Sequence, residues 1–553
     1  MIFVVLPIEG EIVSSKLFKI RRKIMPDIEK AYALLKKYKK ARISLTNRII
    51  QNEQWYKMRH IQPLSDSRYM PASAWLFNSL AVKHADAMEA MPVPYVAARE
   101  PSDTESAEAL SKLLPVLLEQ NDFPAVYSAV WNDKLKHGTG CYGVFWNPAS
   151  SDGLGDIELR RIDLLNLFWE PGVNDLDDSP NLFHCELRSI DALMDAYPQI
   201  KELKNDPADE QAHYLYDDDV DVSDKATVVD WYYKRMGENG KPIVHYCKFV
   251  GDYVLYSTEN HPEYEKSGLY DHGKYPFVTD VMYHIEGTPS GFGTLDIMKD
   301  AQMQIDRLNY AILENARMAA SRRYFIRADG SVNEQEFADW TRPFVHIQGA
   351  GLGEDSIREI TVEPLSDIYL DVINNKITEL KETSGNRDVT TGGSESGVIA
   401  AAAISALQES GSKMTKDMIA SSYRAFCKVC TIMVELIRQF YTVPRCFRVI
   451  NPNGNADKDS GYFIYDNSSI SGIHETEGED DQRQARLPAF DISISAEKSV
   501  QSKREELNNM AKELYSMGVF DPDKRESARL LLGMMDFEGR DELLASLAEA
   551  DDH

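Results

Sequence analysis

The chain has 553 residues, of which 88 are acidic and 61 are lysine or arginine, so its formal net charge is −27. Hydrophobic residues make up 43% and charged residues 27%, which is typical of a soluble protein long enough to hold several cores. The acidic excess argues against a protein that wraps tightly around nucleic acid, because such binding needs clustered lysine and arginine to displace counterions.

The first 60 residues differ from the rest in being basic, with 14 Lys or Arg against 5 Asp or Glu. The apolar start is short and lacks a basic leader, so we do not predict a signal peptide. Residues 26–60 have a helical pattern, and Met25, directly before it, is a possible alternative start. The apolar stripe of this helix is Ile28, Tyr32, Leu35 and Tyr38. Its basic residues form either a docking patch or an ordinary solvated face, and they are Lys36, Lys37, Lys39, Lys40 and Arg42.

The next part of the chain, up to residue 260, reads as a mixture of helices and strands. Apolar spacing predicts helices over 73–91, 103–120, 123–136 and 189–204, the first of them ended by the Pro92 and Pro94 pair. Alternating apolar residues predict strands over 141–146, 157–162, 165–170, 182–187, 227–234, 243–250 and 253–257. The interleaving of both types indicates an α+β body.

A long helix and a small insert follow. Residues 275–290 predict a strand and an exit loop, and residues 291–320 a helix with Asp296 in its first turn. The insert, 322–363, predicts strands over 323–328, 344–348 and 357–362 and a short helix over 332–340. A second helix is expected over 366–383. The apolar face of the long helix is Leu295, Met298, Gln302, Ile305, Leu308, Ile312 and Ala316, and the stripe of the second helix is Leu370, Ile373, Ile377 and Leu380.

A polar, glycine-rich loop over 384–397 then precedes a helical pattern that runs from 398 to 441 without a proline. At the usual rise this helix is roughly 65 Å long, much longer than a typical globular helix. On local evidence the loop is equally well a flexible connector. The first half of the helix is rich in Ala, Ser and Gly. Its second half carries an apolar seam, made of Ile419, Tyr423, Phe426, Cys430, Met433, Ile437 and Phe440, which fits packing against another rod or ordinary burial.

The C-terminal part predicts strands over 445–450, 462–465 and 490–494, with an acidic loop over 471–486. Helices are expected over most of 499–553, where Ser502 and Glu505 form a capping box.

Motifs for catalysis or cofactor binding are weak. The stretch 268–275 nearly matches a phosphate-binding loop, but Tyr275 replaces the Ser or Thr that would hold Mg²⁺, and Pro276 stands where a helix should begin. Cys427 and Cys430 lie inside a helix without a second cysteine pair, so two packed side chains are favoured over a zinc site. We therefore expect no enzyme, cofactor or metal. Six cysteines in a chain this long indicate free thiols and an intracellular protein, and no apolar run reaches the length of a membrane span.

The order of parts from 275 to 442 resembles that of a tailed-bacteriophage portal protein, the head-to-tail connector. The resemblance rests on arrangement rather than on one short signature, and it is looser before residue 275. It implies an α+β portal-like fold with an α/β wing, a two-helix stem, a small α/β clip, a long wing helix and a helical C-terminal crown. The implied parts are a basic N-terminal segment (1–60), the wing (61–290), a stem helix (291–321), the clip (322–363), a second stem helix (364–383), a tunnel loop (384–397), the long wing helix with strands (398–498) and the crown (499–553).

The resemblance implies a ring, usually of twelve copies, at one capsid vertex, through which double-stranded DNA is packaged and ejected without sequence-specific contact. Its expected partners are terminase, head-to-tail adaptor and tail proteins, and capsid and scaffolding proteins, with no membrane. The protein would be assembled in the host cytoplasm and carried in the virion. The implied channel residues are Gly385, Arg387, Thr390, Thr391, Gly392, Gly393, Ser394 and Ser396, and the implied docking residues of the clip are Trp340, Phe344 and Arg358.

Two other classes remain open at this stage. An intracellular helical scaffold or adaptor without a role in DNA translocation fits the composition equally well, although it does not predict a small insert between two long helices. An ATP-driven translocase would also encircle DNA, but it needs a phosphate-binding loop, and the near match at 268–275 fails.

Overall fold

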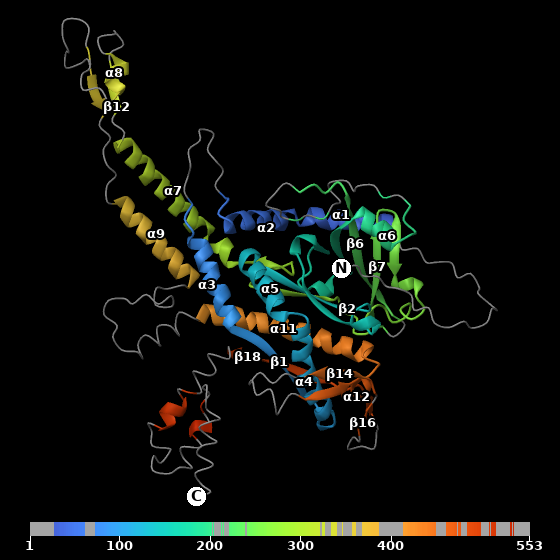
Figure 1. The fold of residues 1–553 in the computed structure, drawn as a ribbon. Coiled ribbons are helices and arrows are strands. Elements are labelled where there is room, and N and C mark those ends of the chain that lie inside the picture. Colours follow the sequence, from blue (N-terminus) through green and yellow to red (C-terminus); the bar gives the residue numbers. More distant parts are fainter. Residues whose placement is uncertain are drawn as a thin grey trace. The chain divides into compact units, whose positions relative to one another are not determined.

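The computed structural model shows an α+β protein whose described residues fall into two compact units (Figure 1). The first unit is drawn from Met1–Ile50, Ala81–Gly293 and Lys413–His553, and the second from Gln51–Leu80 and Thr294–Ser412. The described residues are 27–60, 72–201, 203, 212, 214, 220–237, 240–320, 323–326, 333–339, 346, 357–360, 368–385, 413–448, 461–472, 474–476, 484–498, 508, 510–515, 531–533 and 535.

A five-stranded antiparallel sheet forms one core of the first unit. Its strand order is that of the chain, and helix α1 (Ile28–Ala41) packs on one face. Leu35 and Tyr38 of this helix are buried against Phe183 and Trp231, and Ile28 and Tyr32 pack at the edge of the same cluster, so the predicted stripe is confirmed. The strands are β4 (Leu167–Trp169), β5 (Asn181–Ser189), β6 (Lys225–Met236), β7 (Pro242–Val250) and β8 (Tyr253–Ser257).

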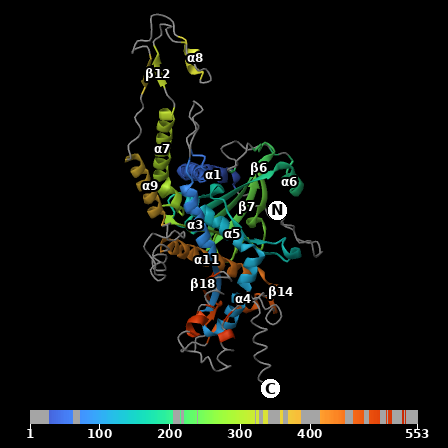
Figure 2. The same ribbon diagram turned by 60° about the vertical axis from the view of Figure 1, so that its left-hand side comes forward.

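A three-stranded sheet in the order β3-β2-β9 forms a second core of the same unit. Helices α5 and α11 contact its strands, α4 packs beside both helices, and Figures 1 and 2 show α11 running beside the sheet. Trp131 of α5 and Phe426 of α11 are fully buried. These elements are α4 (Thr104–Gln120), α5 (Phe123–His137), β2 (Thr139–Asn147), β3 (Asp156–Arg161), β9 (Phe277–Val281) and α11 (Lys413–Phe440).

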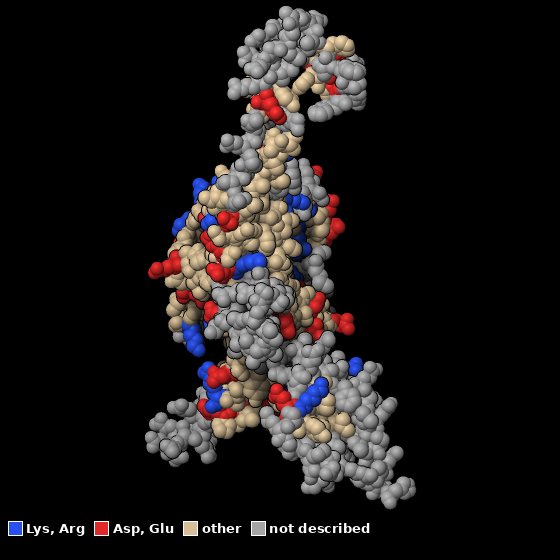
Figure 3. Space-filling view, turned by 90° about the vertical axis from the view of Figure 1, so that its left-hand side faces the viewer, with Lys and Arg blue, Asp and Glu red and all other residues tan. Residues whose placement is uncertain are grey.

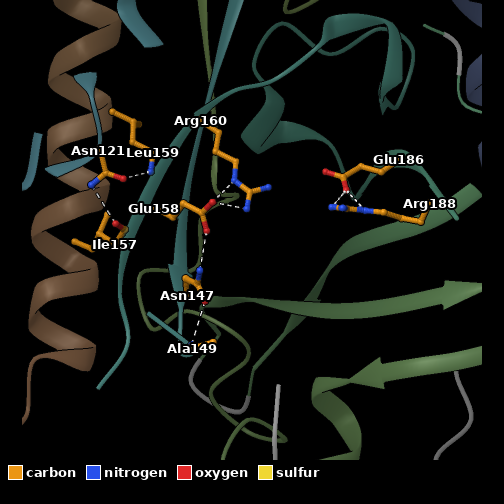
Figure 4. A network of polar contacts seen from close by, with 9 residues as sticks. All are labelled: Asn121, Asn147, Ala149, Ile157, Glu158, Leu159, Arg160, Glu186 and Arg188. Atoms are coloured by element: carbon orange, nitrogen blue, oxygen red, sulfur yellow. Dashed lines mark hydrogen bonds and ion pairs between the residues drawn. The ribbon is translucent and has the colours of Figure 1, made fainter. Parts of the chain in front are cut away.

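Asn121 joins α4 to the edge of this sheet (Figure 4). Its side-chain amide donates to the carbonyl oxygens of Leu117 and Ile157 at 2.8 and 3.1 Å, and its Oδ1 accepts from the backbone N–H of Leu159 at 2.8 Å. One side chain therefore caps the end of a helix and satisfies the open edge of strand β3.

The prediction that the helix over 73–91 ends at the Pro92 and Pro94 pair is confirmed, but the strand that follows directly was not predicted. Helix α3 (Trp75–Glu89) does end before them, but both prolines lie inside strand β1 (Ala90–Ala98), which pairs with β18 (Phe490–Lys498). In an antiparallel pair alternate residues direct their N–H groups away from the partner. Prolines two residues apart are tolerated there, because no ladder hydrogen bond to β18 is lost.

The single helix predicted over 26–60 is also wrong, since the chain breaks at Arg42 between α1 and α2 (Ile43–Tyr56). Arg42 turns inward and donates to the carbonyl oxygens of Leu164 and Leu167. Its guanidinium also lies over the rings of Phe168 and Trp169, at 4.7 and 4.8 Å from the ring centroids. Burial lowers the pKa of Arg42 to about 10. These contacts hold the residue outside helical geometry, at φ −110°.

Smaller differences occur elsewhere in the first unit. The helix expected over 189–204 is the short α6 (Ile190–Ala196), and the expected loop over 471–486 contains a two-stranded pair, β16 (His474–Thr476) and β17 (Gln484–Arg486). The strands expected near 445 and 462 are confirmed. The remaining elements are β10 (Tyr283–His284), β11 (Gly291–Phe292), β14 (Arg445–Arg448), β15 (Tyr462–Tyr465) and α12 (Ser468–Ser471).

The second unit is built on the helix pair α7 (Thr294–Ala320) and α9 (Ile368–Ser384). Met298 and Ile305 of α7 are buried against Ile373 and Leu380 of α9, which confirms both predicted stripes in their central parts. Leu370 is instead 53% exposed, so the stripe of α9 is buried only from Ile373 onward. The other elements of this unit are β12 (Arg323–Ile326), α8 (Glu334–Ala338) and β13 (Ile357–Ile360).

The close packing at the Gly138 turn predicts that adding one methyl group there lowers the stability of the protein strongly. Gly138 has φ +80° after α5, and a Cβ there would lie 2.2 Å from the carbonyl carbon of Phe292. Gly138→Ala should therefore cost roughly 3 kcal/mol or more, from left-handed strain and overpacking together. Gly153→Ala is the matched control, since Gly153 has φ +90° and an open surrounding, and should cost about 1 kcal/mol. Equal thermal shifts of the two variants would contradict the close approach.

Candidate functional site

The candidate channel loop begins where α9 ends. Gly385 has φ +74°, its N–H donates to the carbonyl of Glu382 at 3.1 Å, and the preceding Ser384 donates its hydroxyl to the carbonyl of Lys381 at 2.9 Å. A left-handed glycine after the last helical residue is a usual helix terminator. The predicted break at 383–385 is confirmed, and its cause is this helix-ending geometry.

The other implied channel residues, Arg387, Thr390, Thr391, Gly392, Gly393, Ser394 and Ser396, lie outside the described residues. So does the expected first part of the long helix, residues 398–412. Their assignment to a channel stays a prediction. Gly385 is the one implied channel residue that the described ranges include.

The chain is described again from Lys413, and the start of α11 is fixed by a buried charged network. The ammonium of Lys134 on α5 lies 2.6 Å from Asp280 Oδ1 on β9, 2.7 Å from the hydroxyl of Ser422 and 3.1 Å from the carbonyl of Met418. Ser422 also donates to the second oxygen of Asp280. The side chains of Lys134 and Asp280 are fully buried. Burial lowers the pKa of the Lys134 amine, while the ion pair with Asp280 opposes that shift.

Apolar packing continues this attachment along α11. Ser421 donates to the carbonyl of Val281 at 2.9 Å, and the ring of Phe426 stacks on Phe123 with centroids 4.7 Å apart. Near the other end, Phe440 stacks on Trp146, also at 4.7 Å. The seam predicted from 419 to 440 is confirmed as the face of α11 packed on its own unit, with the side chains of Phe426, Cys430, Met433 and Ile437 fully buried.

The candidate docking insert is described in part. Strands β12 and β13 pair antiparallel, which places Arg358 opposite Phe325, and Tyr324 packs edge-to-face on Phe337 of α8 at 5.0 Å. Phe325 is 64% exposed and was not singled out from the sequence, because alternation in so short a strand does not distinguish a surface aromatic from a core one. Trp340, Phe344 and most of the strand expected over 344–348 lie outside the described residues, and Arg358 is described by its backbone alone.

Sequence reasoning also missed Asp306, which organises the middle of α7. Its buried carboxylate accepts from the N–H and hydroxyl of Ser73 at 2.9 and 2.8 Å, from Gln302 Nε2 at 2.9 Å and from His60 Nε2 at 3.2 Å. The ring of Trp55 covers His60, with centroids 3.7 Å apart. The one available signal was Gln302, a polar residue on the apolar face of the predicted helix.

The basic docking patch proposed on α1 is reduced by the structure. Arg42 is buried, as described above, and Lys37 pairs with Glu170 at 3.2 Å. Lys39 lies over the ring of Phe168 at 5.4 Å. Lys36 and Lys40 are exposed, so the solvated-face interpretation fits better than a dedicated patch of five cations.

Two clusters of charged side chains on the strands pair within the chain. On β3, Arg160 pairs with Glu158, which also accepts from Asn147, and on β5 Arg188 pairs with Glu186 at 2.6 Å (Figure 4). No group of three or more metal-binding side chains occurs in the described ranges. Within those ranges, too, no helix is long and apolar enough to cross a membrane.

The near match to a phosphate-binding loop is a turn. Gly268 and Gly273 have positive φ, the following Tyr275 is buried, and strand β9 comes next instead of a helix. Cys427 and Cys430 lie in α11, where burial raises the pKa of the Cys430 thiol. Neither feature has the geometry of a nucleotide or zinc site.

The buried network predicts that a single substitution lowers stability far more than a combined substitution that removes every charged group of the network. Lys134→Met should lower stability by roughly 3–5 kcal/mol, because it leaves a buried carboxylate without its counter-ion. Lys134→Met combined with Asp280→Leu and Ser422→Ala should recover most of that loss, since no buried charge remains. Lys37→Met, which removes an exposed pair, should change stability by less than about 1 kcal/mol. Chemical denaturation measures all three, and a combined variant as unstable as Lys134→Met would contradict the interpretation.

Comparison with known proteins identifies the family. A search of curated proteins gives no match. The family described as phage P22-like portal protein matches residues 86–552, a range that contains the helix pair, the insert between its helices, the candidate channel loop and α11. Since this match covers most of the chain, the protein belongs to the phage P22-like portal protein family.

Proposed function

We propose that copies of this chain assemble into a ring of about twelve subunits at one vertex of a phage capsid, and that the genome is packaged and ejected through the centre of the ring. The family match over residues 86–552 is the observation that carries the proposal, because portal proteins are structural, ring-forming components of the capsid. An intracellular helical scaffold without a role in DNA passage is not favoured, since it does not account for that match.

The second unit has features that suit the stem and clip of a portal. Helices α7 and α9 lie side by side, and the chain leaves along one and returns along the other, with β12, α8 and β13 between them in sequence (Figures 1 and 2). α7 has 27 residues, which corresponds to about 40 Å. Apolar side chains remain exposed where the two helices meet the insert, namely Leu313, Met318, Ile368, Tyr369, Leu370 and Val372. Neighbouring subunits would cover such side chains in a ring.

The net charge of the chain fits a channel through which DNA passes better than a surface that binds DNA tightly. Each copy carries a net charge of −27, so a ring of copies would repel phosphates and keep DNA from adhering. Acidic and basic side chains of the described residues are interspersed on the face shown in Figure 3, with no broad basic stripe across it. In the loop 384–397 Arg387 is the one basic residue, beside Asp388 and Glu395.

We assign the remaining roles by position. The loop 384–397 would line the channel, with its glycines supplying mobility and its Thr and Ser hydroxyls weak contacts to phosphates. The insert 322–363, with Trp340, Phe344 and Arg358, would receive terminase during packaging and adaptor and tail proteins afterwards. Residues 61–290 would form the wing, and 499–553 the crown.

Assembly is the direct test of the proposal. The purified chain should form rings of about a dozen subunits under the electron microscope without added nucleotide, because the near match to a phosphate-binding loop is a turn. Native mass spectrometry of the same sample gives the subunit number. A monomer or dimer that persists at high concentration would contradict the proposal.

Arg387 separates a channel role from a structural one. Arg387→Ala should leave ring formation and thermal stability unchanged, because the side chain is expected to touch passing phosphates only. It should change the amount of DNA packaged per particle in a complementation assay by less than tenfold, as expected for a weak, non-specific contact. Arg445→Ala is the contrasting variant, since Arg445 donates to the carbonyls of Gly155 and Leu154 at 2.6 and 2.8 Å and should be needed for stability. Loss of rings in Arg387→Ala would assign that residue a structural role.

A further inference from the structure

The two-stranded sheet of β14 and β15 has an outer face whose composition does not fit exposure to water. The pairs Cys446–Ile464 and Arg448–Tyr462 lie directly opposite one another across the strands, and these four side chains form the outer face. Tyr462 is 72% and Ile464 is 75% exposed, while Cys446 and Arg448 are also exposed. A solvated face of an antiparallel sheet is normally polar, so apolar side chains on both faces indicate a second packing partner.

The inner face of the same sheet is already packed. Phe447 and Tyr465 are buried, Phe447 stacks on Tyr441 at 6.2 Å, and the guanidinium of Arg445 lies 4.1 Å from the centroid of the Tyr441 ring. The N–H of Asn467, just after β15, donates to the carbonyl of Tyr441 at 2.8 Å. The sheet is therefore fixed to the end of α11, and the backbone of its outer face is already ordered, which lowers the entropic cost of binding.

The charge on this face indicates what would cover it. Arg448 places an exposed cation on this face. The chain as a whole has 88 acidic against 61 basic residues, so the surface of another copy offers carboxylates in excess. A ring needs two non-equivalent contact surfaces on every subunit, because each copy meets its two neighbours through different faces.

We infer that the outer face formed by Cys446, Arg448, Tyr462 and Ile464 is one side of the contact between neighbouring copies of this chain. It buries Tyr462 and Ile464 against the next subunit and pairs Arg448 with a carboxylate of that subunit. This inference rests on the proposed ring and adds to it a specific contact surface.

Cys446 is a natural reporter of this contact. It is an exposed thiol, whereas Cys141, Cys185, Cys247 and Cys430 are buried and Cys427 is partly buried. In the wild-type chain a maleimide should modify Cys446 at least tenfold more slowly in rings than in subunits dissociated from them, and peptide mass spectrometry identifies the modified cysteine. Full reactivity in both states would overturn the inference and leave the proposed ring intact.

Two further outcomes identify another occupant. Protection of Cys446 in the dissociated subunit would show that the chain covers its own face. Reactivity in purified rings with protection in assembled particles would show that a different capsid component covers it. Either result overturns the inference. If the wild-type chain forms no ring, the proposed function fails and the inference fails with it.

Substitution tests the same face without chemical modification. Tyr462→Ser combined with Ile464→Ser should raise the protein concentration at half-assembly by about tenfold or more, the effect expected when central interface side chains are truncated. Circular dichroism and the unfolding midpoint of the dissociated subunit should not change, since both side chains are solvent-exposed there. Met236→Ser is the matched control, because Met236 is 73% exposed at the end of β6 on the same unit. Equal assembly of all three proteins would overturn the inference.

Discussion

The buried ion pair between Lys134 and Asp280 is the constraint on which the described part of the first unit depends. It lies where α5, β9 and α11 meet, and Ser422 completes it from α11. Apolar packing along the seam of α11 stabilises the helix but tolerates small shifts along its axis, because dispersion contacts have little directionality. Two oppositely charged groups that are fully buried tolerate little such shift, because a lengthened ion pair no longer offsets the cost of burying the charges. We infer that the seam supplies the energy of attachment and the ion pair sets the register.

The same junction controls where the chain leaves and re-enters the unit. Asp280 is on β9, and the chain reaches the start of α7 at Thr294 only after β10 and β11. Gly138 closes α5 in a left-handed conformation and lies against Phe292 and Gly293, the last residues before α7. Val281 is bound by Ser421 of α11. One cluster of contacts within the first unit therefore holds both the last residues before α7 and the first turns of α11.

Local periodicity predicted the helices well, because an amphipathic helix needs only neighbours three and four residues apart. It failed where a distant residue decides the conformation. Pro92 and Pro94 do mark the end of α3, but local pattern did not show that they lie in a strand, because the partner strand β18 is far along the chain and needs no N–H from them. Arg42 looks like a solvated cation until the carbonyls of Leu164 and Leu167 accept its hydrogen bonds. The role of Asp306 could not be predicted, because its hydrogen-bond partners His60 and Ser73 are far away in the sequence.

The candidate site was less predictable than the fold, for a related reason. In a ring protein, some side chains become buried only against other copies. In a single chain these side chains are exposed although they are apolar, so the usual burial pattern does not explain them. Leu370 continues the apolar stripe of α9 but is exposed in the single chain. Ile464 is an apolar residue on the solvent side of a sheet, where a polar residue is expected. Sequence reasoning treats the first as core and the second as ordinary alternation. Each violates the expected pattern of a monomer, and the ring proposed for this portal protein would give both side chains a neighbouring subunit to pack against.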